Sequence, residues 1–241
     1  MRACYIPSMD SAVFLDIVYR IVRNDFIQLG IILFILFTLF EIFPLFFGVP
    51  NTIKKNLPDL FRFQVLRHIY VQAVGGLFFF LVVYFHLHGG ALDITDHPIW
   101  VQVIVTYLCI DFVIYFAHYM VHNYRVPLFS KAHRFHHTIH DDLQWVNSRK
   151  EHVLVLALFA FVFVFVLYVV FKASPWVVPI DVFLFLLFNA FSHYHVPITV
   201  PVLDQIFLFP KHHKNHHIQR SGPYGVTLSL FDTIFGTRSD Y

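Results

Sequence analysis

The sequence has little charge, little glycine and almost no cysteine. Only 13% of its 241 residues are charged, against roughly 25% in a typical soluble domain. Such a chain cannot cover a globular surface with charge, which excludes a water-soluble monomer. The 9 glycines and 12 prolines exclude a collagen-like or disordered chain, and two distant cysteines, Cys4 and Cys109, exclude a disulfide scaffold. The net charge of +2 gives no support for binding nucleic acid.

Hydrophobic residues are abundant instead, at 58% of the chain, with a mean hydropathy of +0.65. Several apolar runs reach the roughly 20 residues that a helix needs to cross a bilayer, and all are longer than an ordinary strand. The runs cover residues 26–48, 69–87, 98–121, 153–171 and 176–194. We therefore predict an all-α integral membrane protein with four to five transmembrane helices. The first run contains Glu41 and Pro44, so it either spans the bilayer or only dips into it.

Two local features refine this arrangement of helices. Gly75 and Gly76 in the second run predict a close approach between two helices. Pro175 and Pro179 predict a tight connection between the last two runs, which therefore form a hairpin.

Lysine and arginine are distributed unevenly between the two sides. If the loop at 123–152 is cytoplasmic, alternation also places the loop at 49–68 and the C-terminal tail there. That side then holds 13 of the 17 basic residues. The positive-inside rule favours this orientation.

Histidine is unusually frequent, with 17 residues, and most of them are clustered. His118 and His122 are four residues apart near the end of the third run, so they share one helical face. Asp111 precedes them on the same stripe. One histidine at a span end is commonly an interfacial residue, but two at this spacing indicate metal ligands.

The spacing H-x-x-H-H occurs twice. Its first copy is His133, His136 and His137, with Ser130 as the predicted N-cap of a short helix. Its second copy, directly preceded by His212, comprises His213, His216 and His217. Residues i, i+3 and i+4 share one helical face, so each copy predicts three converging imidazoles.

The predicted topology brings these clusters to one membrane face. His122 leaves the bilayer on the cytoplasmic side, and His193 and His195 end the last run at the same side. His86, His88 and His97 fall on the opposite side, so they are not expected to be ligands.

Eight to ten converging imidazoles exceed the ligand number of one ion and predict a dimetal site in a cytoplasmic, histidine-rich helical cap. The predicted ligands are His118, His122, His133, His136, His137, His193, His212, His213, His216 and His217. Imidazole suits Fe, Zn and Cu alike, so the ligand type leaves the metal open. Asp111, or Asp141 and Asp142, are candidates to accept hydrogen bonds from the ligating rings.

From about residue 100 to 240 the sequence resembles the fatty acid hydroxylase superfamily, also called the sterol desaturase family. The resemblance lies first in the H-x-x-x-H and the two H-x-x-H-H motifs. It extends to Arg149 with Glu151-His152, Phe191-Ser-His193, Tyr224-Gly225 and Phe231-Asp232-Thr-Ile-Phe-Gly236-Thr237. The sequence departs from the family where Pro223 replaces the usual Asn, Phe231 the usual Trp, and His195 a frequent Asn. With Asp111, the residues Arg149, His152 and His195 form the predicted shell around the ligands.

The resemblance implies a membrane-bound di-iron oxidoreductase that uses O2 to hydroxylate or desaturate a fatty acyl chain or a sterol. Zinc can replace the iron during purification. The resemblance also divides the chain into an N-terminal membrane region, 1–97, with one or two spans, and a catalytic domain, 98–241. The chain has no haem-, flavin- or nucleotide-binding segment, so a separate donor, such as cytochrome b5 or a ferredoxin with a reductase, is expected to supply electrons. The active site is expected on the cytoplasmic face, of the endoplasmic reticulum in a eukaryote or of the inner membrane in a bacterium.

Two other classes of protein remain open. A histidine-rich metal transporter would place its ion sites near the bilayer midplane, whereas these clusters lie in loops and at span ends. A non-catalytic lipid-binding relative could retain the ligands without the reaction.

Overall fold

The computed structural model describes residues 24–46, 57–124, 126–138, 151–194 and 198–238, and these residues are mostly helical. The long helices are α2 (Asp25–Phe46), α4 (Leu57–His88), α5 (Ile99–Asn123), α7 (Val153–Val164), which continues into the π-helical turn η2 (Phe165–Val170), and α8 (Val177–Ser192). The short helices are α6 (Pro127–His136), η3 (Leu203–Gln205), α9 (Pro210–Gln219) and α10 (Leu230–Phe235).

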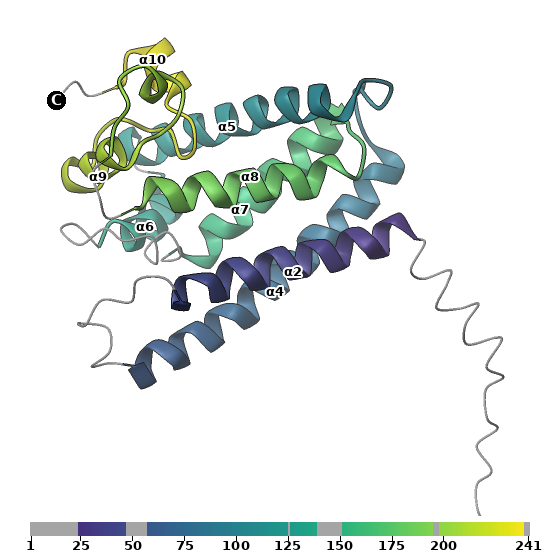
Figure 1. The fold of residues 1–241 in the computed structure, drawn as a ribbon, viewed down its shortest axis with the longest axis horizontal. Helices are drawn as coiled ribbons and strands as arrows, with labels where there is room; N and C mark the ends of the chain where they lie inside the picture. The colour runs from purple at the N-terminus through teal and green to yellow at the C-terminus, as the bar shows by residue number, and fades with distance from the viewer. Residues whose placement is uncertain (1–23, 47–56, 125, 139–150, 195–197, 239–241) are drawn as a thin grey trace, which may run out of the picture.

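The long helices form two layers (Figure 1). Helices α5, α7 and α8 lie alongside one another, and α4 packs both on α7 and on α2. At Gly75 of α4 an added Cβ atom would lie 3.2 Å from the ring of Phe37 in α2, whereas one at Gly76 would meet no atom within 4 Å. The predicted close approach therefore occurs at Gly75.

The two ends of the bundle differ. Helices α6, α9 and α10 gather at one end, beside the C-terminal end of α5 (Figure 1). At the other end β1 (Leu92–Asp93) pairs in parallel with β2 (Phe171–Lys172). This two-residue ladder, with an ion pair of 3.2 Å between Lys172 and Asp93, departs from an all-α fold, as does a single antiparallel bridge between Phe207 and Leu228.

By length and composition, two helical segments of the described chain could cross a membrane: Ile99–Asn123 and Val153–Val170. Three apolar helical stretches are shorter: Ile27–Leu39, Val71–His86 and Val177–Ser192. Four to five spans and their orientation stay a prediction.

Proline explains several helix boundaries. Pro127 and Pro210 occupy the first position of α6 and α9, where the missing N–H has no intrahelical partner to lose. Pro179 lies in the first turn of α8 rather than in the preceding connection, which the same argument permits. The prediction for Ser130 was wrong: α6 begins at Pro127, and the Ser130 hydroxyl donates to the carbonyl of Val121 at 2.6 Å.

Candidate metal centre

Nine histidine side chains from four helices converge at the end of the bundle where α6 and α9 lie. Seven of them are buried, and His122 and His133 are half-buried. They come from α5 (His118 and His122), from α6 and its C-cap (His133, His136 and His137), from the C-cap of α8 (His193), and from α9 (His213, His216 and His217).

These side chains form two groups, in each of which one nitrogen per ring lies within 4.8 Å of all the others. The first group contains His118, His122, His133, His137 and His216. The second group contains His136, His193, His213 and His217. The groups are neighbours, because the rings of His137 and His217 have centroids 4.6 Å apart.

The H-x-x-H-H spacing explains how one helix serves both groups. At 3.6 residues per turn, residues i and i+4 lie about 40° apart around the helix axis, whereas i+3 and i+4 lie about 100° apart. In α6 the i and i+4 residues, His133 and His137, therefore join the first group, and His136 joins the second. In α9 the roles are exchanged: the i and i+4 residues join the second group, and His216 joins the first.

The Nε2 atoms within each group are separated by the distances expected of ligands that share an ion. In the first group the separations are 2.9 Å (His118–His133), 3.1 Å (His118–His122), 3.1 Å (His122–His133), 2.9 Å (His133–His137) and 3.2 Å (His137–His216). In the second they are 3.3 Å (His136–His193), 3.0 Å (His193–His213) and 3.2 Å (His213–His217). Two nitrogens that each lie about 2.1 Å from one ion, at octahedral or tetrahedral angles, are about 3.0–3.4 Å apart.

In five of the nine rings, the second nitrogen, Nδ1, lies within hydrogen-bond distance of an oxygen that can only accept a hydrogen bond. Four of these oxygens are backbone carbonyls: Tyr224 for His118 (2.7 Å), Arg220 for His122 (3.1 Å), Ser221 for His216 (2.8 Å) and Asn189 for His193 (2.8 Å). The fifth is the carboxylate of Glu151, 2.9 Å from Nδ1 of His136. Each Nδ1 therefore carries the proton, and each Nε2 presents a lone pair, the form that binds metal.

This arrangement tests whether the residues fit a metal. His118 and His122 both present Nε2 lone pairs, and these atoms are 3.1 Å apart without a proton between them. His136 and His193 repeat the pattern in the second group at 3.3 Å. Facing lone pairs in a buried site repel each other, and a cation between them converts the repulsion into attraction. Each group therefore fits one metal ion.

Burial keeps the rings of His213, His216 and His217 neutral. It lowers the pKa of His216 to about 3. Burial also lowers the pKa of His213 and His217, and nearby imidazoles, those of His193 and His136 first, lower them further. Neutral imidazole is the form that ligates a metal, so no proton has to be displaced from Nε2 near neutral pH.

The C-terminal segment supports the first group through Asp232. This buried carboxylate accepts hydrogen bonds from the backbone N–H groups of Tyr224 and Gly225, both at 2.7 Å, and from the Thr237 hydroxyl at 2.7 Å. It thereby holds the Tyr224 carbonyl that accepts from His118. An added Cβ atom at Gly225 would collide with the Leu228 carbonyl, so only glycine fits there.

His212 lies outside both groups. Its Nε2 atom is 3.2 Å from the carboxylate of Asp204, which also pairs with Arg238 at 2.8 Å and accepts from the Thr199 hydroxyl at 2.6 Å. These contacts tie the start of α9 to η3 and to the C-terminal segment. We therefore leave His212 out of the proposed ligand set.

The predicted surrounding residues are placed differently from the ligands. Asp111 accepts from the Thr227 hydroxyl at 2.5 Å and the Leu228 N–H at 3.3 Å, not from a ligating ring. His152 accepts from the Leu154 N–H at 3.2 Å and caps α7. Arg149, His195, Asp141 and Asp142 lie outside the described residues.

Sequence reasoning did not identify the acceptors that the structure uses around the ligands. Glu151 was recognisable only as part of a motif. The four carbonyl oxygens carry no residue-type signal, because every residue has one.

His86 packs against Tyr168 (ring centroids 5.4 Å apart) and His97 is exposed; both lie outside the two groups.

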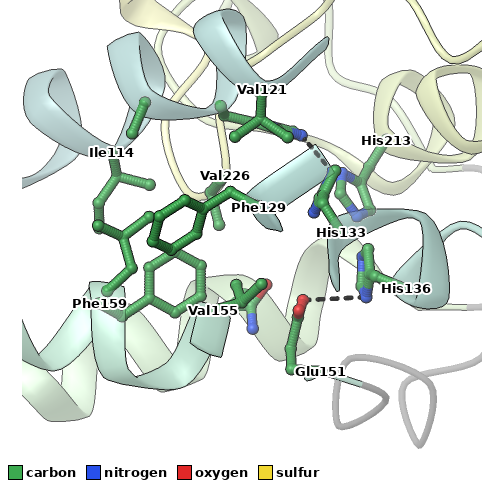
Figure 2. A pocket seen from close by; sticks show the side chains of 14 residues that line it. Ile114, Val121, Phe129, His133, His136, Glu151, Val155, Phe159, His213 and Val226 are labelled. Carbon is green, nitrogen blue, oxygen red and sulfur yellow. Dashed lines mark hydrogen bonds and ion pairs between the residues drawn. The ribbon is translucent and has the colours of Figure 1, made fainter. Parts of the chain in front are cut away.

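An apolar cavity opens onto both groups. Figure 2 shows hydrophobic side chains such as Ile114, Phe129 and Phe159 on one side, and His133, His136 and His213 on the other. We call this space the histidine cavity. Its form suits a hydrocarbon chain with one carbon held beside the imidazoles.

A second, polar opening reaches the first group. Its walls include His122, His133 and His137, together with the exposed Arg134 and Arg220. The first group is thus accessible from a polar, basic surface as well as from the apolar histidine cavity.

Comparison with known families identifies the class of protein. The model of the fatty acid hydroxylase family matches residues 103–237, more than half of the chain. The chain belongs to the fatty acid hydroxylase family. Membership implies an oxidoreductase of the lipid hydroxylase or desaturase type, and the two histidine groups are compatible with a metal site in it. Neither a curated protein nor a solved structure matches the chain.

Proposed function

We propose that this protein is a di-iron, O2-dependent hydroxylase of a membrane lipid, with a fatty acyl chain or a sterol as substrate. The observation that carries the proposal is the pair of adjacent imidazole groups, each with facing Nε2 lone pairs, at the end of an apolar cavity. Bound iron would supply the oxidising power that cleaves an unactivated C–H bond.

The proposed ligands are five imidazoles for one ion and four for the other. The first set is His118, His122, His133, His137 and His216, and the second is His136, His193, His213 and His217. Glu151 and the four carbonyl oxygens hold the rings in the ligating tautomer and orientation.

The histidine cavity supplies binding, orientation and exclusion of water. Its walls around Val155, Leu158 and Val226 hold a hydrocarbon chain by burial of apolar surface. Among the described residues, the only polar side chains in its walls are imidazoles, Glu151 and Asn189, so the reacting carbon is held where the ligands converge.

In the proposed reaction one oxygen atom of O2 enters the C–H bond as a hydroxyl group, and the other leaves as water. The balance requires two electrons and two protons, which a separate donor supplies. Desaturation begins with the same hydrogen removal and differs in losing a second hydrogen. The exposed Arg134 and Arg220 beside the polar opening support an acidic donor, such as a cytochrome b5 or a ferredoxin. The position of this opening on the cytoplasmic side is part of the proposal.

The first test is the metal content of the full chain, expressed with iron and purified in detergent without oxygen. We expect two iron ions per chain, one for each group. His136 and His137 are adjacent in sequence but belong to different groups, so His136→Ala and His137→Ala should each lose at least one ion. His97→Ala is the matched control, because His97 is exposed and outside both groups, and it should retain both.

The second test is the reaction itself. Isotopically labelled O2, supplied with a reduced ferredoxin, should place one labelled oxygen atom in a lipid product of the wild type and none in His136→Ala. A product with an added double bond and no label would favour desaturation. Folded protein that retains no metal under these conditions would contradict the enzyme proposal and favour a non-catalytic lipid-binding relative.

A further inference from the structure

A second cavity lies between α2, α4, α7 and α8. All of the described side chains that line it are apolar. Its walls include Phe37 of α2, Val74 and Phe78 of α4, Phe163 of α7 and Val182 of α8. We call it the inner cavity.

The inner cavity and the histidine cavity share one lining residue, Phe159 of α7. The Phe159 ring contacts Phe185 edge to face, with centroids 5.3 Å apart, and Phe185 contacts Phe163 in the same way at 5.5 Å. An aromatic wall therefore runs from the histidine cavity into the inner one, and the Phe159 ring stands at the boundary between them.

Part of the inner cavity lies outside the matched family region. The family match begins at residue 103, so α2 and α4 lie outside it. These two helices nevertheless form one side of the inner cavity, with Phe37 seated against Gly75. The region that closes the cavity is thus separate from the region that holds the histidines.

We propose that the inner cavity receives the distal end of the substrate's hydrocarbon chain, which passes the Phe159 ring, so that α2 and α4 set the preferred chain length. This inference rests on the proposed function, because it assigns the reacting part of the same chain to the histidine cavity.

The chemistry of the walls favours a hydrocarbon tail over other occupants. A polar ligand or headgroup would lose its hydrogen bonds to water and find no side-chain partner. A peptide segment would bring unpaired N–H and C=O groups into the same apolar space. A chain that already fills the histidine cavity instead continues past Phe159 and buries further methylene groups.

Photo-crosslinking tests the occupant without requiring bound metal. The probe is hexadecanoic acid with a diazirine on its terminal carbon, added to the full chain as purified in detergent. We expect adducts on inner-cavity residues such as Val74 and Phe163, which excess unlabelled hexadecanoic acid should abolish. In Val74→Phe the added ring fills the cavity, and these adducts should be lost.

Chain length is the second readout. Unlabelled saturated fatty acids of increasing length compete for crosslinking, and the loaded enzyme converts the same series to product. Val74→Phe should weaken long acids relative to short ones by about tenfold, as expected when about two methylene groups lose their burial. Leu77→Phe, on the exposed face of the same helix, is the matched control and should keep the wild-type profile. Phe159→Ala widens the boundary and should favour longer acids.

Adducts absent from the inner cavity, or a chain-length profile that Val74→Phe and Leu77→Phe leave equally unchanged, would overturn the inference. Adducts that excess fatty acid does not remove would assign the cavity to a resident bilayer lipid and overturn it too. A third outcome separates the two proposals. If the protein binds no iron and forms no product, but fatty acid still competes for the adducts and Val74→Phe still abolishes them, the proposed reaction is refuted and the lipid site is supported.

Discussion

The two ends of the bundle both bury polar side chains, but they satisfy them in opposite ways. At the end near the β ladder, donors meet acceptors: the Thr106 hydroxyl donates to Asp181 at 2.7 Å. There Gln102 also donates to the His97 carbonyl at 2.7 Å and accepts from the Ser174 N–H at 2.9 Å. At the histidine end, Nδ1 of five of the nine rings has an oxygen acceptor, whereas the Nε2 atoms face one another as acceptors.

This difference separates a structural polar cluster from a functional one. In the structural cluster, donors such as the Thr106 hydroxyl and the Gln102 amide find acceptors within the protein. Such pairing is favoured because a buried group without a partner costs roughly 1–3 kcal/mol. At the histidine end, the Nε2 lone pairs face one another, and those from different helices point to two common positions. Changes at the two ends should therefore affect different properties.

The largest effect is expected from Asp232→Ala. It leaves the buried N–H groups of Tyr224 and Gly225 without an acceptor and releases the carbonyl that orients His118. We expect a loss of stability on the order of 3 kcal/mol, together with loss of iron from the first group. Thermal unfolding in detergent and metal analysis measure both. Asp232→Asn keeps one acceptor oxygen, so it should lose less stability and less iron. An unchanged iron content in Asp232→Ala would contradict this supporting role.

The next largest effect is expected from Glu151→Ala, which removes the acceptor for His136. Loss of such a partner typically weakens metal affinity about 10- to 100-fold. We expect this loss in the second group only, measured by competition with a chelator. Glu151→Gln retains an acceptor oxygen, so its metal affinity should lie between those of Glu151→Ala and the wild type. Equal weakening of both ions would show that Glu151 does not act through His136 alone.

At the opposite end, Asp181→Ala should change stability without changing metal. It removes the buried carboxyl group that accepts from the Thr106 hydroxyl. We expect a cost of about 1–2 kcal/mol, seen as a lower melting temperature, with the wild-type ratio of iron to protein. If Asp181→Ala remains folded but binds less iron, the separation between a structural end and a metal-binding end of the bundle would be wrong.

The smallest effect on metal is expected from His212→Gln, although His212 adjoins a proposed ligand. Its ring binds Asp204, and glutamine can still donate to that carboxylate. The variant should keep two ions per chain and unfold slightly earlier than the wild type. The loss of one ion would return His212 to the ligand set.

Much of the helical framework was predictable from the sequence. Long apolar runs gave α5, α7 with η2, and α8 within a few residues, because continuous hydrophobicity favours a helix that satisfies its own backbone groups. The start of α4 at Leu57, rather than at residue 69, was not predictable from hydropathy, since its first turns contain Arg62 and Arg67. The short β ladder was also missed, because two residues carry no periodic signal.

The candidate site was predictable in composition but not in arrangement. Nine of the ten predicted ligands converge, because the i, i+3, i+4 spacing acts through the local geometry of one helix. Their division into two groups depends on how α6 and α9 face each other. Spacing alone treats His212 and His213 as equivalent neighbours, although one binds Asp204 and the other joins the second group.

The sequence by itself determined the apolar helices, the histidine spacing and the family, since each depends on residues close together in the chain. Only the tertiary structure decided which imidazoles form each group, which oxygens accept from their Nδ1 atoms, and that Phe159 lines two cavities. Those properties depend on contacts between residues as distant as His118 and Tyr224. Such contacts arise from the packing of whole helices, whose positions no local pattern specifies.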